Sequence, residues 1–99
     1  MIFADNTRAV PDADVVSCQL DTGMVLLNLR TKTYYALDPV GVAIWSSLEA
    51  GADIGATCSA VRSEFAVEPM PCRRDTEELL MQMERAGVVA IERSTTSAS

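Results

Sequence analysis

The stretch TYYALDPVGVAIWSSLEAG, residues 33–51, decides the fold, because a strand in it leads directly into a helix. Thr33–Leu37 is short and rich in β-branched and aromatic residues, as strands are. Asp38 is a favoured N-cap, and Pro39 suits the first helical position, where a missing N–H costs nothing. The apolar residues then recur every four positions, at Val40, Ile44 and Leu48. The pattern predicts a helix over 39–50.

Two more strands precede this unit, VVSCQL at 15–20 and MVLLNL at 24–29, with short turns between them. Alternation with a period of two predicts one buried face for each strand. On this prediction the buried face consists of Val16, Cys18, Leu20, Val25, Leu27, Leu29, Tyr35 and Leu37. The opposite face is not cleanly polar and carries Met24, Leu26 and Tyr34. The three strands together predict an antiparallel β-meander.

Two more helices are expected after the first. Asp53 can cap the second, whose apolar stripe is Ile54, Cys58, Val61 and Phe65. We expect the prolines in Glu68–Pro71 to end it and the third helix to span Cys72–Ala86, with acids in its first turns favouring the dipole. Val88–Ile91 is a candidate short strand. The order predicts an α+β fold: a three-stranded antiparallel β-meander followed by three helices, winged-helix-like, with the helices over one sheet face.

Composition predicts one globular domain over residues 1–93 and a disordered tail over 94–99. Apolar residues make up 48% of the chain and charged residues 22%. No apolar run could span a bilayer and no secretory signal is evident, so we expect a cytoplasmic protein without membrane contact. The cysteines at 18, 58 and 72 have no metal-binding spacing, and we interpret them as small buried hydrophobes.

Several function classes are disfavoured. The net charge of −6 and the lack of a basic patch argue against nucleic-acid binding. The absence of histidine removes the usual general base and zinc ligand. The acidic group Asp75, Glu77 and Glu78 is explained by the helix dipole and by local ion pairs. We therefore expect neither an enzyme nor a cofactor.

The informative feature is the edge of the last strand, Thr33–Leu37, because a meander leaves that edge with unpaired backbone groups. Lys32, at the start of the strand, is the only charged residue there that would disfavour pairing with another chain, and the two tyrosines offer contact surface. A guest strand could add there by β-augmentation. The alternatives are that the N-terminal ten residues or the strand after Gly87 cover the edge, or that it pairs with a second copy in a homodimer.

Three segments together resemble the PqqD-like domains that recognise leader peptides. They are LNLRTKTYYALDPVGVAIWSSLEAG at 27–51, the capped helix ending at Phe65, and EELLMQMERAGVV at 77–89. The resemblance covers about Val15–Val89. A standalone chain of this size most resembles the leader-binding protein of lasso-peptide pathways. The resemblance implies that a leader docks antiparallel to the third strand and packs against the third helix. The cysteine protease and cyclase of such pathways are then the expected partners.

The site implied by the edge and the resemblance joins the third strand to the third helix. Its predicted residues are Lys32, Thr33, Tyr34, Tyr35, Ala36, Leu37, Thr76, Leu79, Leu80 and Met83. The rival interpretations are a peptide carrier in another modified-peptide pathway, such as pyrroloquinoline-quinone assembly, a winged-helix DNA-binding regulator, and a structural subunit that dimerises.

Overall fold

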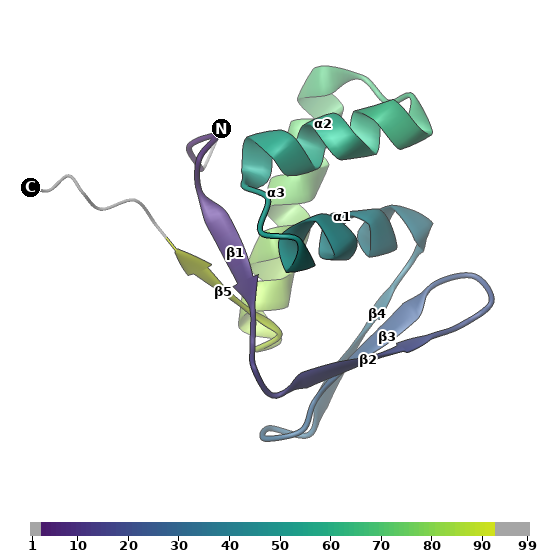
Figure 1. The fold of residues 1–99 in the computed structure, drawn as a ribbon, viewed down its shortest axis with the longest axis vertical. Helices are drawn as coiled ribbons and strands as arrows, with labels where there is room; N and C mark the ends of the chain where they lie inside the picture. Colours follow the sequence, from purple (N-terminus) through teal and green to yellow (C-terminus); the bar gives the residue numbers. More distant parts are fainter. Residues whose placement is uncertain (1–2, 93–99) are drawn as a thin grey trace, which may run out of the picture.

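The computed structural model of the protein describes residues 3–92. The elements follow the order β1 (Arg8–Pro11), β2 (Val15–Gln19), β3 (Met24–Asn28), β4 (Thr33–Leu37), α1 (Pro39–Glu49), α2 (Ile54–Phe65), α3 (Pro69–Arg85) and β5 (Val89–Glu92). Strands β2, β3 and β4 form an antiparallel meander, and β1 pairs with β5 in a separate two-stranded sheet (Figure 1). The predicted α+β fold is confirmed, and β1 is an addition to it.

Local capping fixes the starts of α1 and α2. The Asp38 carboxylate accepts a hydrogen bond from the Gly41 N–H at 2.8 Å, and that of Asp53 accepts one from the Ala56 N–H at 2.8 Å. Each bond satisfies one backbone donor that the first helical turn leaves unpaired. Because these signals are local, both starts are as the sequence predicts.

Helix α3 begins three residues earlier than predicted, at Pro69 instead of Cys72. The prolines at 69 and 71 do not lie outside the helix; both occupy its first turn, where a helix needs no N–H donors. As a result, Asp75, Glu77 and Glu78 lie beyond the first turn, and the predicted dipole role is wrong. Glu77 is instead buried, where it pairs with Arg73 and accepts a hydrogen bond from the Phe3 N–H at 3.0 Å.

The predicted faces of β2 and β3 are wrong, whereas Tyr35 and Leu37 of β4 face the core as predicted. Leu26 lies opposite Tyr35, and Met24 lies opposite Leu37, so these four residues share one face. This face packs into the core, and Leu26 is completely buried. The outward face carries the residues that were assigned to the core, namely Val16, Cys18, Leu20, Val25, Leu27 and Leu29, together with Tyr34 and Ala36. Both faces are apolar in sequence, so alternation alone could not distinguish them.

The two ends of the described chain pair with each other. Strands β1 and β5 are antiparallel, with Ala9 opposite Ile91. They lie apart from β4 in Figure 1, and neither of them pairs with it. Neither strand therefore covers the free edge of β4, which excludes two of the alternatives considered from the sequence. Among residues 3–92, β4 has only β3 as a strand neighbour.

The core lies between the inner sheet face and the three helices. Its largest fully buried side chains include Trp45, Leu26, Ile54, Leu80 and Met83. Two cysteines, at 58 and 72, are buried as expected, whereas Cys18 is exposed on the outward sheet face, so the prediction for Cys18 is wrong. The predicted disordered tail, 94–99, lies outside the described residues. None of the helices in the described part of the chain is long and apolar enough to cross a membrane.

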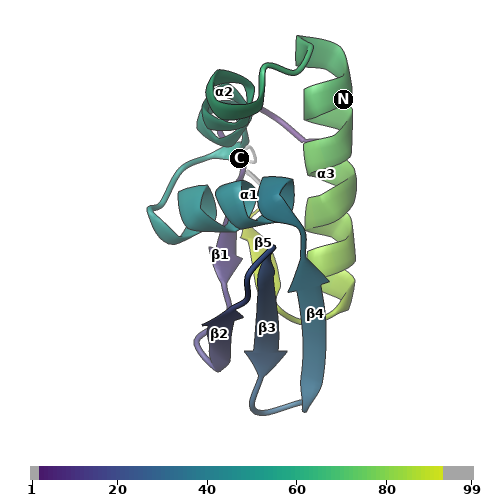
Figure 2. The same ribbon diagram turned by 90° about the vertical axis from the view of Figure 1, so that its right-hand side faces the viewer.

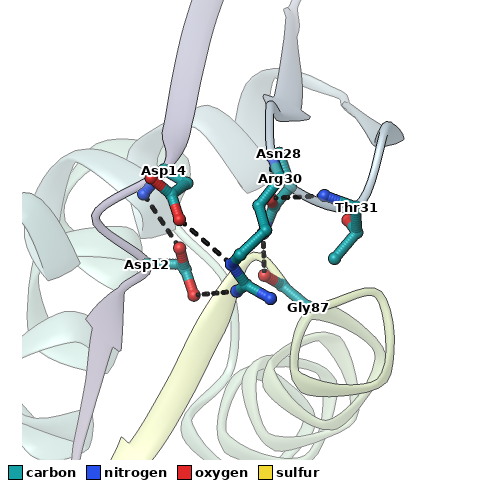
Figure 3. Close-up of polar contacts among 6 residues, drawn as sticks. All are labelled: Asp12, Asp14, Asn28, Arg30, Thr31 and Gly87. Atoms are coloured by element: carbon teal, nitrogen blue, oxygen red, sulfur yellow. Dashed lines mark hydrogen bonds and ion pairs between the residues drawn. The ribbon is translucent and has the colours of Figure 1, made fainter.

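A buried asparagine fixes the start of β4 relative to the end of α3 (Figure 3). The Asn28 amide donates to the Gly87 carbonyl at 2.8 Å and accepts from the N–H groups of Arg30 and Thr31 at 2.9 and 3.1 Å. The side chain is completely buried, so each of these bonds replaces one that water would otherwise make. The β3–β4 hairpin is thereby held against the turn that follows α3.

Candidate peptide-binding groove

The hydrogen-bond pattern of the meander shows which β4 groups face outward. In the β2–β3 turn, the Leu20 N–H donates to the Gly23 carbonyl, so the next inter-strand bonds belong to Val25 and Leu27. Along an antiparallel ladder, hydrogen-bonded and non-hydrogen-bonded pairs alternate. The backbone groups of Val25 and Leu27 point to β2, so β3 bonds to β4 through the residues that alternate with these two, such as Leu26. Tyr34 and Ala36, which face Leu27 and Val25, therefore direct their N–H and C=O groups to the free edge.

Two adjoining pockets accompany this edge. The smaller, of about 300 Å³, lies between β4 and α3 and is lined by Tyr35, Ala36, Leu37, Asp38, Gly41, Leu79 and Gln82. The larger, of about 380 Å³, lies between the three helices and shares Asp38, Gly41, Leu79 and Gln82 with the first. Its apolar lining includes Val40, Ile44, Val61, Val67 and Pro71. A strand paired with β4 would thus have an apolar pocket beside it, into which its side chains could project.

One hydrogen bond crosses from β4 to α3. The Tyr35 hydroxyl donates to the Gln82 side-chain oxygen at 2.7 Å. Partial burial, with a smaller contribution from the carboxylate of Asp38, raises the pKa of Tyr35 above its ordinary value of 10.0. Tyr35 therefore stays protonated and able to donate at neutral pH. Figure 2 shows the two elements side by side, with the start of α3 beyond the end of β4 that leads into α1.

The structure brings most, but not all, of the predicted site residues to this groove. Tyr35, Ala36, Leu37, Thr76 and Leu79 line one or both pockets. Thr33 and the exposed Tyr34 lie on β4, and Lys32 precedes it in the hairpin. Leu80 and Met83 are completely buried in the core and line neither pocket. A guest in the groove would not reach those two side chains in this arrangement.

The prediction omitted residues of α3 that lie about a quarter turn away from its core stripe. Asp75, Glu78 and Gln82 line the larger pocket beside Leu79. They recur at i, i+3 and i+7 and so share one helical face. The apolar stripe of α3 marks the face that packs into the core, whereas the face that lines the groove is mixed. The open edge of β4 could have indicated this groove-lining face of α3. Where α3 adjoins an open strand edge it is accessible to solvent, so polar residues are expected there.

The arrangement defines the class of the domain: a small winged-helix-like domain with an open strand edge flanked by an apolar pocket, a surface suited to an extended peptide. Comparisons with known proteins identify the family. Residues 23–89 match the family described as coenzyme PQQ synthesis protein D, PqqD. The chain belongs to the PqqD family, whose members act as recognition elements for ribosomally synthesised and post-translationally modified peptides (RiPPs). Domains of this kind are non-catalytic, which confirms the expectation that the chain is not an enzyme.

Two solved structures are similar over most of their length. TbiB1 in complex with the TbiA(beta) leader peptide has a TM-score of 0.76 and 34% identity, and the match covers 81% of this chain and 93% of that one. A lasso peptide synthetase B1 complexed with the leader peptide has a TM-score of 0.73 and 26% identity, with 86% and 98% covered. No significant match was found among curated proteins.

Proposed function

We propose that this protein captures the leader segment of a ribosomally made precursor peptide as an added strand on β4 and delivers it to maturation enzymes. Membership of the PqqD family makes it a leader-peptide-binding protein of RiPP biosynthesis. The proposal concerns the way the leader is held and the enzymes that receive it. We infer a lasso-peptide pathway, in which the receiving enzymes are a leader-cleaving cysteine protease and a cyclase.

The observation that carries the proposal is the vacant β4 edge with two pockets beside it, the larger of them mainly apolar. Tyr34 and Ala36 each offer one outward donor and one outward acceptor, so a guest strand can form up to four main-chain hydrogen bonds there. These bonds supply affinity regardless of guest sequence, whereas the pockets distinguish among guest side chains. The two similar structures are both complexes with leader peptides, which supports the same role here.

A titration tests the binding step. Leader peptides of candidate precursors found by sequencing the genes around this protein's own should be labelled with a fluorophore; the cognate leader should show saturable anisotropy, and unlabelled leader should displace it. The core segment of the same precursor is the matched control and should not compete. Failure of the leader to bind to the folded protein would reject the proposal.

A cleavage assay tests the delivery step. A leader-cleaving cysteine protease from the same pathway should remove the leader faster when this protein is present, because binding raises the local concentration of precursor. A variant that no longer binds the leader should give no acceleration. If the protease acts equally fast with and without the protein, delivery is excluded, even if the leader binds.

A further inference from the structure

The groove carries negative charge at the end where β4 leads into α1. Asp38, Asp75 and Glu78 line the larger pocket there, and no lysine or arginine lines either pocket. The lining between these carboxylates is apolar. A guest side chain that enters this pocket therefore passes acidic groups on the way to an apolar interior.

The α3 carboxylates at this end have no partner among residues 3–92. Asp75 and Glu78 are exposed, and neither side chain forms a hydrogen bond or an ion pair within that range. The two arginines just before them on α3 form no ion pair with them within residues 3–92. Arg73 pairs with the buried Glu77, and Arg74, one turn before Glu78, forms no ion pair with it. The negative charge is thus available to a bound molecule.

The opposite end of the groove is positive. Lys32 is exposed in the hairpin immediately before β4, and its side chain has no ion pair within the described part of the chain. Arg30 in the same hairpin is held by Asp12 and Asp14 at 3.1 and 3.0 Å (Figure 3), so it is less available. On α3, the groove-facing series ending at Gln82 continues one turn later with the exposed Arg85.

The direction of an added strand determines which guest residues meet which end. The meander is antiparallel throughout, and antiparallel pairing is slightly the more stable arrangement. An antiparallel guest has its N-terminal side at the Leu37 end and its C-terminal side at the Thr33 end. The five residues of β4 span about 17 Å, roughly twice the Debye length at physiological salt. Each end therefore acts on the guest separately.

We propose that the groove selects leaders with an ordered charge pattern: basic residues on the N-terminal side of the segment paired with β4, and acidic residues on its C-terminal side. This inference rests on the proposed function. The larger, mainly apolar pocket fixes the register of the guest, and the charged ends favour one direction of insertion over the other. Asp75 and Glu78 are the determinants at the acidic end, and Lys32 and Arg85 are those at the basic end.

A display library of randomised linear peptides, selected for binding to the intact protein, tests the pattern. We expect the enriched peptides to carry lysine or arginine before a central apolar segment and aspartate or glutamate after it. A selected peptide resynthesised with its charges exchanged should bind about ten- to thirtyfold more weakly at low salt. The difference should shrink as salt is added, because exposed charges are screened.

Matched variants connect the pattern to the groove. Combined Asp75→Asn and Glu78→Gln should weaken a selected peptide about three- to tenfold, whereas Glu49→Gln with Glu64→Gln removes the same charge outside both pockets and should have no effect. Enriched peptides without charge order, or with the reverse order, would overturn this inference and leave leader binding intact. Failure of the folded protein to enrich any peptide would instead overturn the proposed function as well.

Discussion

Replacing Ala36 with proline should remove one hydrogen-bond donor from the guest-binding edge while leaving the sheet intact. The Ala36 N–H points away from β3, so proline at this position breaks no bond in the meander. Proline is tolerated on edge strands when the lost N–H would face solvent. The Ala36 side chain is exposed, and its replacement leaves no cavity in the core.

The expected loss follows from the bonds that a guest would make. A main-chain hydrogen bond contributes about 0.5 to 1.5 kcal/mol net, and the proline ring also obstructs the guest backbone at the position of the lost bond. We expect a total of about 1 to 3 kcal/mol, which is about 5- to 150-fold in the dissociation constant. The leader titration measures this directly, and the midpoint of urea unfolding shows whether the fold has changed.

The other edge of the same sheet supplies the control. Ser17 on β2 also directs its N–H away from β3. It lies opposite Leu26 in a pair of the β2–β3 ladder that exchanges no hydrogen bonds, as Ala36 does opposite Val25. Ser17→Pro should therefore resemble Ala36→Pro in its effect on stability but leave leader affinity unchanged. If Ala36→Pro binds the leader as tightly as the unmodified protein, the leader does not add to β4 as a strand, and the reasoning about the vacant edge is refuted.

Three further predictions concern the scaffold around the groove. Asn28→Ala should lower the free energy of unfolding by about 1 to 3 kcal/mol, measured by urea denaturation, because buried partners lose their bonds. Gly23→Ala should cost about 1 to 3 kcal/mol and weaken leader binding, since its Cβ would lie 2.1 Å from the Leu37 carbonyl oxygen; an unchanged unfolding midpoint would contradict this close approach. In Tyr34→Phe, tyrosinate absorbance should report Tyr35 alone and reach its midpoint above pH 10.0. Because the folded pKa of Tyr35 is raised, its stabilising contribution is present below pH 10.0 and is lost as the pH rises through the folded pKa. A midpoint at or below pH 10.0 would contradict the burial argument.

The sequence predicted the features that depend on near neighbours in the chain. Asp38 and Asp53 each determine a helix start through a bond to a residue three positions later, so inspection of a few residues suffices. The edge of β4 was also predictable, because a meander always leaves its last strand open on one side. Whether another segment covers that edge depends on the pairing of β1 with β5, which joins residues about eighty positions apart.

The features that could not be predicted depend on register and on mixed surfaces. Leu26 and Leu27 are identical in type and adjacent, yet one is completely buried and the other half-buried on the outward face. Only the pairing with β4 distinguishes them. In α3, Leu79 and Leu80 are equally apolar, but Leu79 lines the groove and Leu80 lies in the core. Hydrophobicity does not separate the two roles when a binding surface adjoins the core.

The pairing of β1 with β5 also bears on how this domain could be combined with other proteins. It brings Arg8 opposite Glu92, and these strands lie apart from β4 (Figure 1). An enzyme fused genetically after β5, or before β1, would be tethered on that side and would leave the groove accessible. The domain is thus suited to use as a portable module that confers leader recognition on an unrelated catalyst.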